Sequence, residues 1–427
     1  MAIREDVLVV GGGLAGATAA LAAAETGATV RLVSAAESTL RHASGVVDVL
    51  GYPPGRDPNR PVATPFESVA DLPPTHPYSL VGADAIRDGL ALFDRAVGDR
   101  YRGGHTDRNA LVPTQTGTVK PTARYPTTVA PGLAGAGGDV LLVGFETLLD
   151  FDAPLAASHL DRVYDADVRG VTLQSPSAFD ADADATRFAR ALDADEPLDG
   201  TPAREALAAA VDRHLDGADR VGLPAILGRE DAPAVRATLQ SRLGVDVFEV
   251  PGGPPSLLGL RLDDRLTEAL DAAGVRITTG RRAVGHEAEE GRVTAALVDH
   301  AGSTVPYHAA EFVLATGGLV GGGVEADRDG VREPVFDCRV PHPDDRYDWF
   351  EDEPFGEHAF ARFGVVPDRH LRPTEADGDP TYENLRAAGA VVGGADVAAE
   401  KSASGVSLAT GAVAGRAAGT NATQGAN

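Results

Sequence analysis

Residues 7–27 read VLVVGGGLAGATAALAAAETG. The apolar run at 7–10 predicts a buried strand, the glycines predict a tight turn, and the alanine-rich remainder predicts a helix. Gly11, Gly13 and Gly16 follow G-x-G-x-x-G spacing. In that pattern the first glycine permits the turn, the second lets a phosphate approach the backbone, and the third allows close helix–strand packing. The helix N-terminus offers free N–H groups to the phosphate, so the stretch predicts nucleotide binding.

The strand that completes this βαβ unit, residues 29–33, is followed by Ser34 and, three residues later, by Glu37. Dinucleotide-binding folds usually place Asp or Glu about 20 residues after the glycines, where it binds the adenosine ribose. Either Ser34 or Glu37 substitutes for that residue, or the ligand has no adenosine. The second alternative points to FMN, whereas the first leaves FAD open.

Two later segments end in glycines that would lie near a flavin. The first, EFVLATGG, predicts an apolar strand that ends at Thr316 and Gly317, where a cofactor can approach the backbone closely. The second, NLRAAGAVVGGAD, ends at Asp396, a candidate to bind the ribityl hydroxyls. A helix of small residues follows from about Ser404, and its N-terminus would stabilise an anionic reduced flavin.

Because these motifs lie at both ends of the chain, we expect the two ends to form one domain. The predicted fold class is α/β, with a Rossmann-like dinucleotide- or flavin-binding domain made of residues 1–60 and 255–427. Residues 61–254 are predicted to form an inserted α+β cap domain that faces the cofactor on the substrate side. The buried strand at 140–143 is assignable to either domain.

Charge and lysine content exclude several classes of partner. The chain has 63 acidic and 38 basic residues, a net charge of −25, and its lysines are only Lys120 and Lys401. Nucleic acids and anionic membrane surfaces are poor partners for such a polyanion, because binding phosphates needs clustered cations. An acidic, lysine-poor surface is typical of proteins from a halophilic proteome. A GC-rich genome would explain the missing lysines but not the acid excess.

Metal and membrane sites are also not predicted. One cysteine, Cys338, cannot form an internal disulfide or an iron–sulfur cage, and the chain therefore suits a reducing cytoplasm. The 11 histidines show no metal-ligand spacing such as HExxH. The uncharged run at 7–24 contains too many glycines for a spanning helix, so no direct membrane span is expected.

Taken together, the motifs resemble the B subunits of the anaerobic glycerol-3-phosphate dehydrogenase family. The resemblance covers most of the chain, and its glycine motifs are shared by many flavoproteins. More specific are ASG-x-x-D-x-L-G within LRHASGVVDVLG and VGF-x-x-L-L-DFDA within LLVGFETLLDFDAPLAASHL. The remaining matching segments are PTQTGTVKPT, FVLATGGLVGGG and NLRAAGAVVGGAD.

The resemblance implies noncovalent FMN and a catalytic dimer with an FAD-containing A subunit. It also implies an iron–sulfur C subunit that anchors the pair at the inner face of the cell membrane and passes electrons to quinone. The substrate would be sn-glycerol 3-phosphate, oxidised to dihydroxyacetone phosphate. Two other interpretations stay open: a self-sufficient FAD-dependent dehydrogenase or reductase of a small organic acid, and a flavin-free structural subunit.

Further candidate site residues are chosen because they lie near a predicted flavin-binding segment or because they are lysines, which are rare in this chain. Ser44 and Gly45 come soon after the second strand, where related flavoproteins bring a loop past the isoalloxazine; a plain turn serine is the alternative. Lys120, and similarly Lys401, would neutralise the flavin phosphate or the reduced ring, unless each is a surface lysine. His42 is a candidate proton donor. No general base is identified, so His42 and Lys120 are the only catalytic candidates.

Overall fold

Strand β1 (Ile3–Val10) lies between β2 (Val30–Ser34) and β16 (Ser303–Leu314) and pairs in parallel with both in the computed structural model of the chain. The structure describes residues 3–57, 59–174, 183–254, 256–354 and 356–425. The chain divides into two compact units, and each is described by itself. The first unit comprises Met1–Thr39, Asp48–Val97 and Arg265–Asn427, and the second comprises Leu40–Val47 and Gly98–Asp264.

The first unit is built on a seven-stranded sheet in the order β13-β2-β1-β16-β15-β14, with β19 also paired to β16. The residues at 7–10 are at most 3% exposed, because Val7 and Val9 pack into one buried cluster and Leu8 and Val10 pack into another on the opposite face of the sheet. Strand β15 is antiparallel to both of its neighbours, β16 and β14, and the other strands pair in parallel with β16 or β2. Their bounds are β13 (Arg276–Thr279), β14 (Ala283–Glu289), β15 (Arg292–His300) and β19 (Leu385–Ala387).

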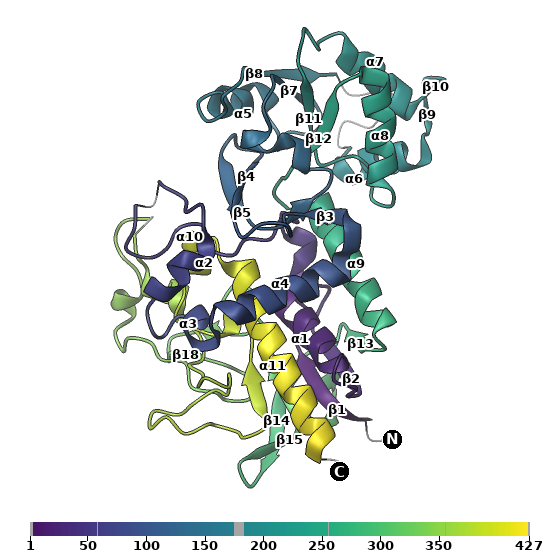
Figure 1. The fold of residues 1–427 in the computed structure, drawn as a ribbon. Helices are drawn as coiled ribbons and strands as arrows, with labels where there is room; N and C mark the ends of the chain where they lie inside the picture. Colours follow the sequence, from purple (N-terminus) through teal and green to yellow (C-terminus); the bar gives the residue numbers. More distant parts are fainter. Residues whose placement is uncertain (1–2, 58, 175–182, 255, 355, 426–427) are drawn as a thin grey trace. The chain divides into compact units, whose positions relative to one another are not determined.

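Helices α1 (Leu14–Ala24) and α11 (Ala403–Gly425) pack along each other's length (Figure 1). Glycines spaced four apart on α11 meet alanines spaced four apart on α1 in the same order. The pairs are Gly411 with Ala15, Gly415 with Ala19, and Gly419 with Ala23. The two helices therefore run parallel, and both N-termini lie at the edge where β1 ends. The two ends of the chain thus share one unit.

Residues 61–97, which the sequence placed in the insertion, pack with the first unit. Helix α4 (Ala83–Val97) lies against α11, and Gly89 fits against the backbone of Leu408, where a Cβ would come within 2.6 Å of it. Small residues on both helices permit this close approach. The chain therefore leaves the first unit later than the predicted boundary.

The second unit contains a four-stranded parallel sheet in the order β12-β11-β7-β8. Helices connect its strands, and a helical crossover of this kind joins parallel strands. Strand β7 (Val140–Phe145), which contains the strand predicted at 140–143, lies inside this sheet and not in the sheet of the first unit. The other bounds are β8 (Val168–Leu173), β11 (Arg220–Pro224), β12 (Asp246–Val250), α5 (Ala153–Leu160), α6 (Ala185–Ala194), α7 (Ala203–Asp212) and α8 (Ala232–Leu243).

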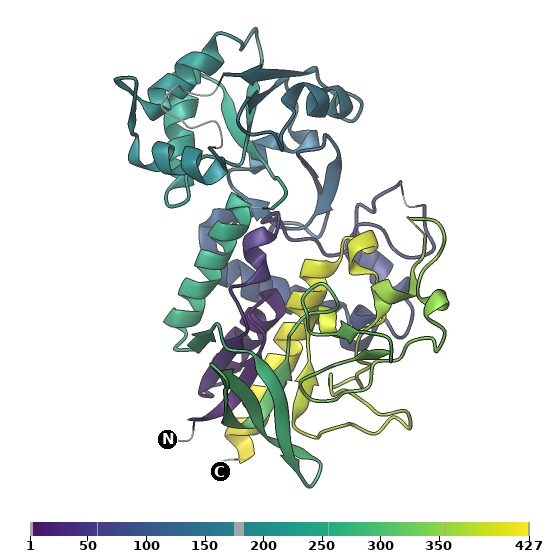
Figure 2. The same cartoon turned by 180° about the vertical axis from the view of Figure 1, so that it is seen from behind.

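Short elements complete both units (Figure 2). The division between the units falls inside α9 (Leu257–Ala272), whereas the predicted boundary at residue 255 lies outside the described residues. The remaining elements are α2 (Pro65–Ser68), α3 (Pro77–Val81), α10 (Val397–Glu400), β3 (Tyr101–Arg102), β4 (Ala110–Pro113), β5 (Val119–Thr122), β6 (Tyr125–Pro126), β9 (Pro197–Leu198), β10 (Thr201–Pro202), β17 (Glu325–Ala326) and β18 (Val331–Arg332). Within the described part of the chain, no helix is both long and apolar enough to cross a bilayer.

Candidate functional site

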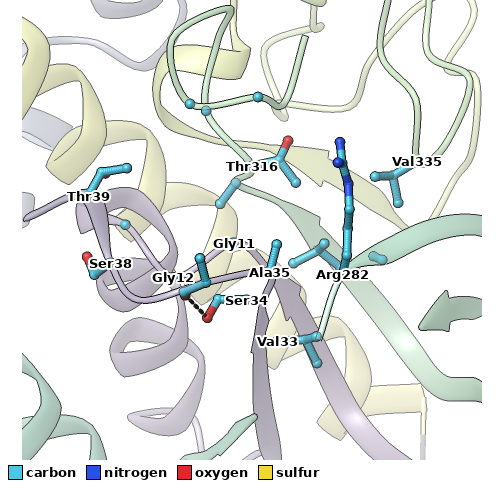
Figure 3. A pocket seen from close by; sticks show the side chains of 18 of the residues that line it. Gly11, Gly12, Val33, Ser34, Ala35, Ser38, Thr39, Arg282, Thr316 and Val335 are labelled. Atoms are coloured by element: carbon cyan, nitrogen blue, oxygen red, sulfur yellow. Dashed lines mark hydrogen bonds between the residues drawn. The ribbon is translucent and has the colours of Figure 1, made fainter. Parts of the chain in front are cut away.

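A cavity of about 280 Å3 opens at the carboxyl ends of β1, β2 and β16 in the first unit. Ligands of open α/β sheets bind at this edge, outside the carboxyl ends of the strands. In Figure 3, Ser38 and Thr39 lie on one side of the glycine loop, and Arg282 and Val335 lie on the other. The predicted site residues that line it are Gly11, Gly13, Ser34, Thr316 and Gly317.

The glycine loop has the geometry that the sequence pattern predicts. Gly11 has a φ of +124°, and a Cβ there would collide with the carbonyl oxygen of Ala315. A Cβ at Gly16 would collide with the carbonyl oxygen of Gly11, so α1 can approach the loop only with glycine at this position. The N–H group of Gly11 donates to the carbonyl oxygen of Val33 at 2.8 Å, which ties the loop to β2.

The N-terminus of α1 faces the cavity without a competing side chain. Gly13 is its N-cap, makes no side-chain capping bond, and is followed by no acidic residue in the first turn. The nearest atom to a Cβ built on Gly13 is the Thr39 hydroxyl at 3.8 Å, so the space in front of this turn is open. Free N–H groups and the positive end of the helix dipole fit a phosphate at this position.

The hydroxyl of Thr316 provides a further test of fit. Its oxygen is buried, yet it has no hydrogen-bond partner among the described residues. Buried polar atoms are nearly always paired, and a polar atom of a bound ligand would pair this one. Thr316 borders the cavity beside the glycine loop, so a phosphate-bearing cofactor with polar atoms fits the residues present.

Both residues considered for the adenosine ribose line the cavity. Ser34 is 8% exposed, and its hydroxyl donates to the carbonyl oxygen of Ala36 at 2.8 Å, which leaves the oxygen able to accept a bond. Glu37 is exposed and also borders the cavity. The geometry therefore leaves both FMN and FAD open. Ser34 has no carboxylate for an adenosine ribose, as expected for FMN, whereas Glu37 has a carboxylate that suits FAD.

Two residues that line the cavity were not predicted from the sequence: Arg282, which directly precedes β14, and Val335, which follows β18. Arg282 borders the cavity and pairs with Glu325 at 3.1 Å, and Glu325 also pairs with Arg332 at 2.9 Å. The arginine directly precedes β14 and stands in no motif, so only the pairing of the strands brings it to the cavity.

Asp396 and Ser404 lie in the first unit but outside the residues that line the cavity. Asp396 is the N-cap of α10, and its carboxylate accepts from the N–H of Ala399 at 3.0 Å. The N–H of Ser404, in the first turn of α11, donates to the carboxylate of Asp48 at 2.9 Å. The predicted helix N-terminus is therefore present, and a side chain of this protein caps it.

Four other predicted residues, His42, Ser44, Gly45 and Lys120, belong to the second unit, so the structure does not bring them together with the cavity in one unit. Gly45 has a φ of +72° and packs against Leu258, and its carbonyl oxygen accepts from the hydroxyl of Tyr101 at 2.7 Å. The neighbouring residue, Ser44, is half-buried. Lys120 is half-buried on β5, and His42 is exposed.

The thiol of Cys338 is buried and protonated. Cys338 is 3% exposed, and burial, followed by the charge of Glu333, raises the pKa of its thiol well above the ordinary value. A thiol that stays protonated is a poor nucleophile. Within the ranges that the structure describes, no three His, Cys, Asp or Glu side chains are grouped so that they could hold a metal ion.

Comparison with known proteins identifies the family. Residues 6–406 match the family model of the FAD-binding domain. A protein of Halobacterium salinarum strain R1, named as the probable B subunit of anaerobic glycerol-3-phosphate dehydrogenase, is 57% identical over 98% of this chain and 98% of its own length. This chain belongs to that family of B subunits. Another member, from Pectobacterium atrosepticum, is 32% identical over 95% of this chain and 96% of its own length.

Family membership confirms the predicted resemblance, the Rossmann-like α/β fold class and a flavin-dependent oxidoreductase. Among solved structures, a 3-ketosteroid dehydrogenase from Rhodococcus jostii is similar to the chain with a TM-score of 0.39 and 14% identity. That likeness covers 98% of this chain and 97% of the other.

Proposed function

We propose that the cavity binds FMN and that the chain is the FMN subunit of an anaerobic glycerol-3-phosphate dehydrogenase complex. The observation that carries the flavin assignment is the buried hydroxyl of Thr316, next to the glycine loop, which has no hydrogen-bond partner among the residues that the structure describes. In this proposal the N–H groups that follow Gly13 hold the phosphate, and Thr316 and Gly317 contact the flavin. Gly11 and Gly16 keep the strand, the loop and α1 close enough to form the site.

The side chain at the end of β2 favours FMN over FAD. Ser34 has no carboxylate for an adenosine ribose, and its hydroxyl proton is already donated to the carbonyl oxygen of Ala36. Glu37 supports FAD as the second candidate, because a carboxylate at this edge suits the ribose hydroxyls. Chromatography and mass analysis of the flavin released on denaturation distinguish the two.

The predicted ligands outside the cavity remain part of the proposal. Asp396 would bind the ribityl hydroxyls, and the first turn of α11 at Ser404 would face the ring. We keep Ser44, Gly45 and Lys120 as proposed flavin ligands. We assign no general base in this chain.

The bound flavin supplies the electron acceptor for oxidation of sn-glycerol 3-phosphate to dihydroxyacetone phosphate. We propose that an FAD-containing A subunit performs most of this oxidation and that this chain relays the electrons. An iron–sulfur C subunit would pass them to quinone and hold the complex at the inner face of the cell membrane. The names of the relatives support this role, since they designate one subunit of a larger dehydrogenase. The single cysteine also requires any iron–sulfur cluster to lie in a partner.

Anaerobic reduction tests the relay. The chain is purified in concentrated salt and mixed with sn-glycerol 3-phosphate, alone and after reconstitution with an A subunit, and the A subunit alone is measured beside it. We expect no bleaching of the isolated chain, and in the reconstituted sample we expect bleaching of one flavin more than the A subunit alone loses. Bleaching of the isolated chain would favour a self-sufficient dehydrogenase, and an isolated chain without flavin would favour a structural role.

A further inference from the structure

Two carboxylates, Asp48 and Glu400, are buried around the first turn of α11. Both residues are 3% exposed. Asp48 accepts the N–H of Ser404 at 2.9 Å, and Glu400 accepts from the hydroxyl of Ser402 at 3.0 Å. The positive end of the α11 dipole therefore already faces a carboxylate of this chain.

The histidine in contact with Glu400 does not cancel its charge. Nδ1 of His76 accepts the N–H of Tyr78 at 3.0 Å, so the ring proton lies on Nε2, which is 3.0 Å from Glu400. That pattern assigns a neutral imidazole. Lys401 is half-buried beside the cluster, and its ammonium donates to the carbonyl oxygen of Ala398 at 2.8 Å.

The pKa of the Tyr78 hydroxyl responds to its burial and to the negative charges of Asp48 and Glu400 at the first turn of α11. Its hydroxyl is fully buried, donates to the carbonyl oxygen of Val49 at 2.5 Å, and lies where a Cβ on Gly405 would collide with it. Burial raises the pKa of Tyr78 well above its ordinary value, and the charges of Asp48 and Glu400 raise it further. The field at the first turn of α11 therefore opposes an additional negative charge.

The first turn of α11 overhangs the sheet edge at which the cavity opens. The pairing of Gly411 with Ala15 places Thr410 level with the first residue of α1, Leu14. Helix α11 begins at Ala403, so it extends past the start of α1 by about 10 Å, at 1.5 Å per residue. The residues that line the cavity come from other elements, so a ligand held at the N-terminus of α1 would meet this turn where it extends out of the cavity along α11.

We propose that Asp48 and Glu400 set the reduction potential of the bound flavin by opposing the negative charge of its reduced ring. The inference rests on the proposed function. Two electrons from glycerol 3-phosphate, directly or through the A subunit, and one proton convert the neutral oxidised ring into a reduced ring with one negative charge. The carboxylates destabilise that charge, which makes the flavin a weaker oxidant and a better donor to the next acceptor.

Equilibrium dye titration of the visible spectrum in concentrated salt measures the potential. Asp48→Asn and Glu400→Gln each remove one buried charge, and we expect the reduced flavin to bind at least tenfold more favourably relative to the oxidised form. That change is a positive shift of about 30 mV for a two-electron couple. The control is Asp71→Asn, which removes an exposed carboxylate of the same unit whose side chain is 67% exposed, and it should leave the potential unchanged.

The outcomes separate this inference from the proposed function. If both variants keep flavin but their potential is unchanged or shifts negative, the inference is wrong while the function stands. Loss of flavin from both variants would also overturn it, because the carboxylates would then organise the site without tuning it. A colourless wild-type chain would overturn the proposed function, and this inference with it.

Discussion

A side chain at Gly11 would occupy the space of the carbonyl oxygen of Ala315. The loop after β1 and the end of β16 therefore touch backbone to backbone, and the cavity opens beside this contact. The φ of +124° at Gly11 adds a second requirement for glycine. The site is thus built from main-chain atoms that only a particular pattern of glycines can bring together.

Gly11→Ala should abolish flavin binding. The new Cβ must displace either the loop or the end of β16, which separates the groups that border the cavity. The matched control is Gly27→Ala, because Gly27 also has a positive φ, +87°, but a Cβ there meets nothing within 4 Å. The control should cost about 1–2 kcal/mol of stability through backbone strain alone and should keep its flavin. Equal flavin content in Gly11→Ala and wild type would contradict the assignment.

Thr316→Val should weaken flavin binding without destabilising the flavin-free protein. Its hydroxyl has no partner within the described part of the chain, so its removal costs no protein hydrogen bond. Loss of one hydrogen bond to the ligand corresponds to about 1 kcal/mol, roughly a fivefold weaker affinity. Fluorescence titration of the flavin-free protein measures this change.

Thr410→Val is the matched control for Thr316→Val. The Thr410 hydroxyl is buried, accepts from the N–H of Gly389 at 2.8 Å and donates to the carbonyl oxygen of Val406. Its loss leaves buried groups unpaired, and unfolding should become easier by about 1–3 kcal/mol. If Thr316→Val destabilised the flavin-free protein as much as Thr410→Val, the Thr316 hydroxyl would have a structural role.

Gly415→Ala should destabilise the first unit, because its Cβ would collide with the carbonyl oxygen of Ala19 on α1. The expected cost is about 1–3 kcal/mol, typical of overpacking, measured as the shift in thermal unfolding. Alanine normally favours a helix over glycine by about 1 kcal/mol, so the sign of the effect tests the contact. The control is Gly425→Ala, where a Cβ meets nothing within 4 Å, and it should not destabilise the protein.

Dilution from molar salt into dilute buffer should unfold the protein. With a net charge of −25, repulsion between surface carboxylates is screened only when the Debye length is short, about 3 Å at 1 M salt. Circular dichroism during stepwise dialysis follows the transition. A chain that keeps its fold in dilute buffer would contradict the interpretation of its composition as salt adaptation.

The residues that the sequence could identify are those whose role is local. The glycine spacing at Gly11, Gly13 and Gly16 depends only on the turn between one strand and one helix, and Thr316 directly follows an apolar strand. Arg282 stands in no motif, and the motif that contains Asp48 does not indicate its contact with α11. Strand pairing brings Arg282 to the cavity, and Asp48 meets Ser404 across a separation of 356 residues.

The domain boundaries depended on packing in the same way. Helix α4 joins the first unit because Gly89 fits against α11. The hydrophobic periodicity of residues 83–97 predicts a helix but does not indicate which helix it packs against. Strand β7 reads as a buried strand in either sheet, and its hydrogen bonds to β8 and β11 decide which one it joins.

The most direct measurement of the central claim is the identity and amount of flavin released from the purified chain. The protein is isolated in concentrated salt and denatured. The released flavin is then separated by chromatography, identified by mass spectrometry and quantified per chain from its visible absorbance. We predict one FMN per wild-type chain and none from Gly11→Ala. FAD in its place, or a wild-type chain without flavin, would contradict the account.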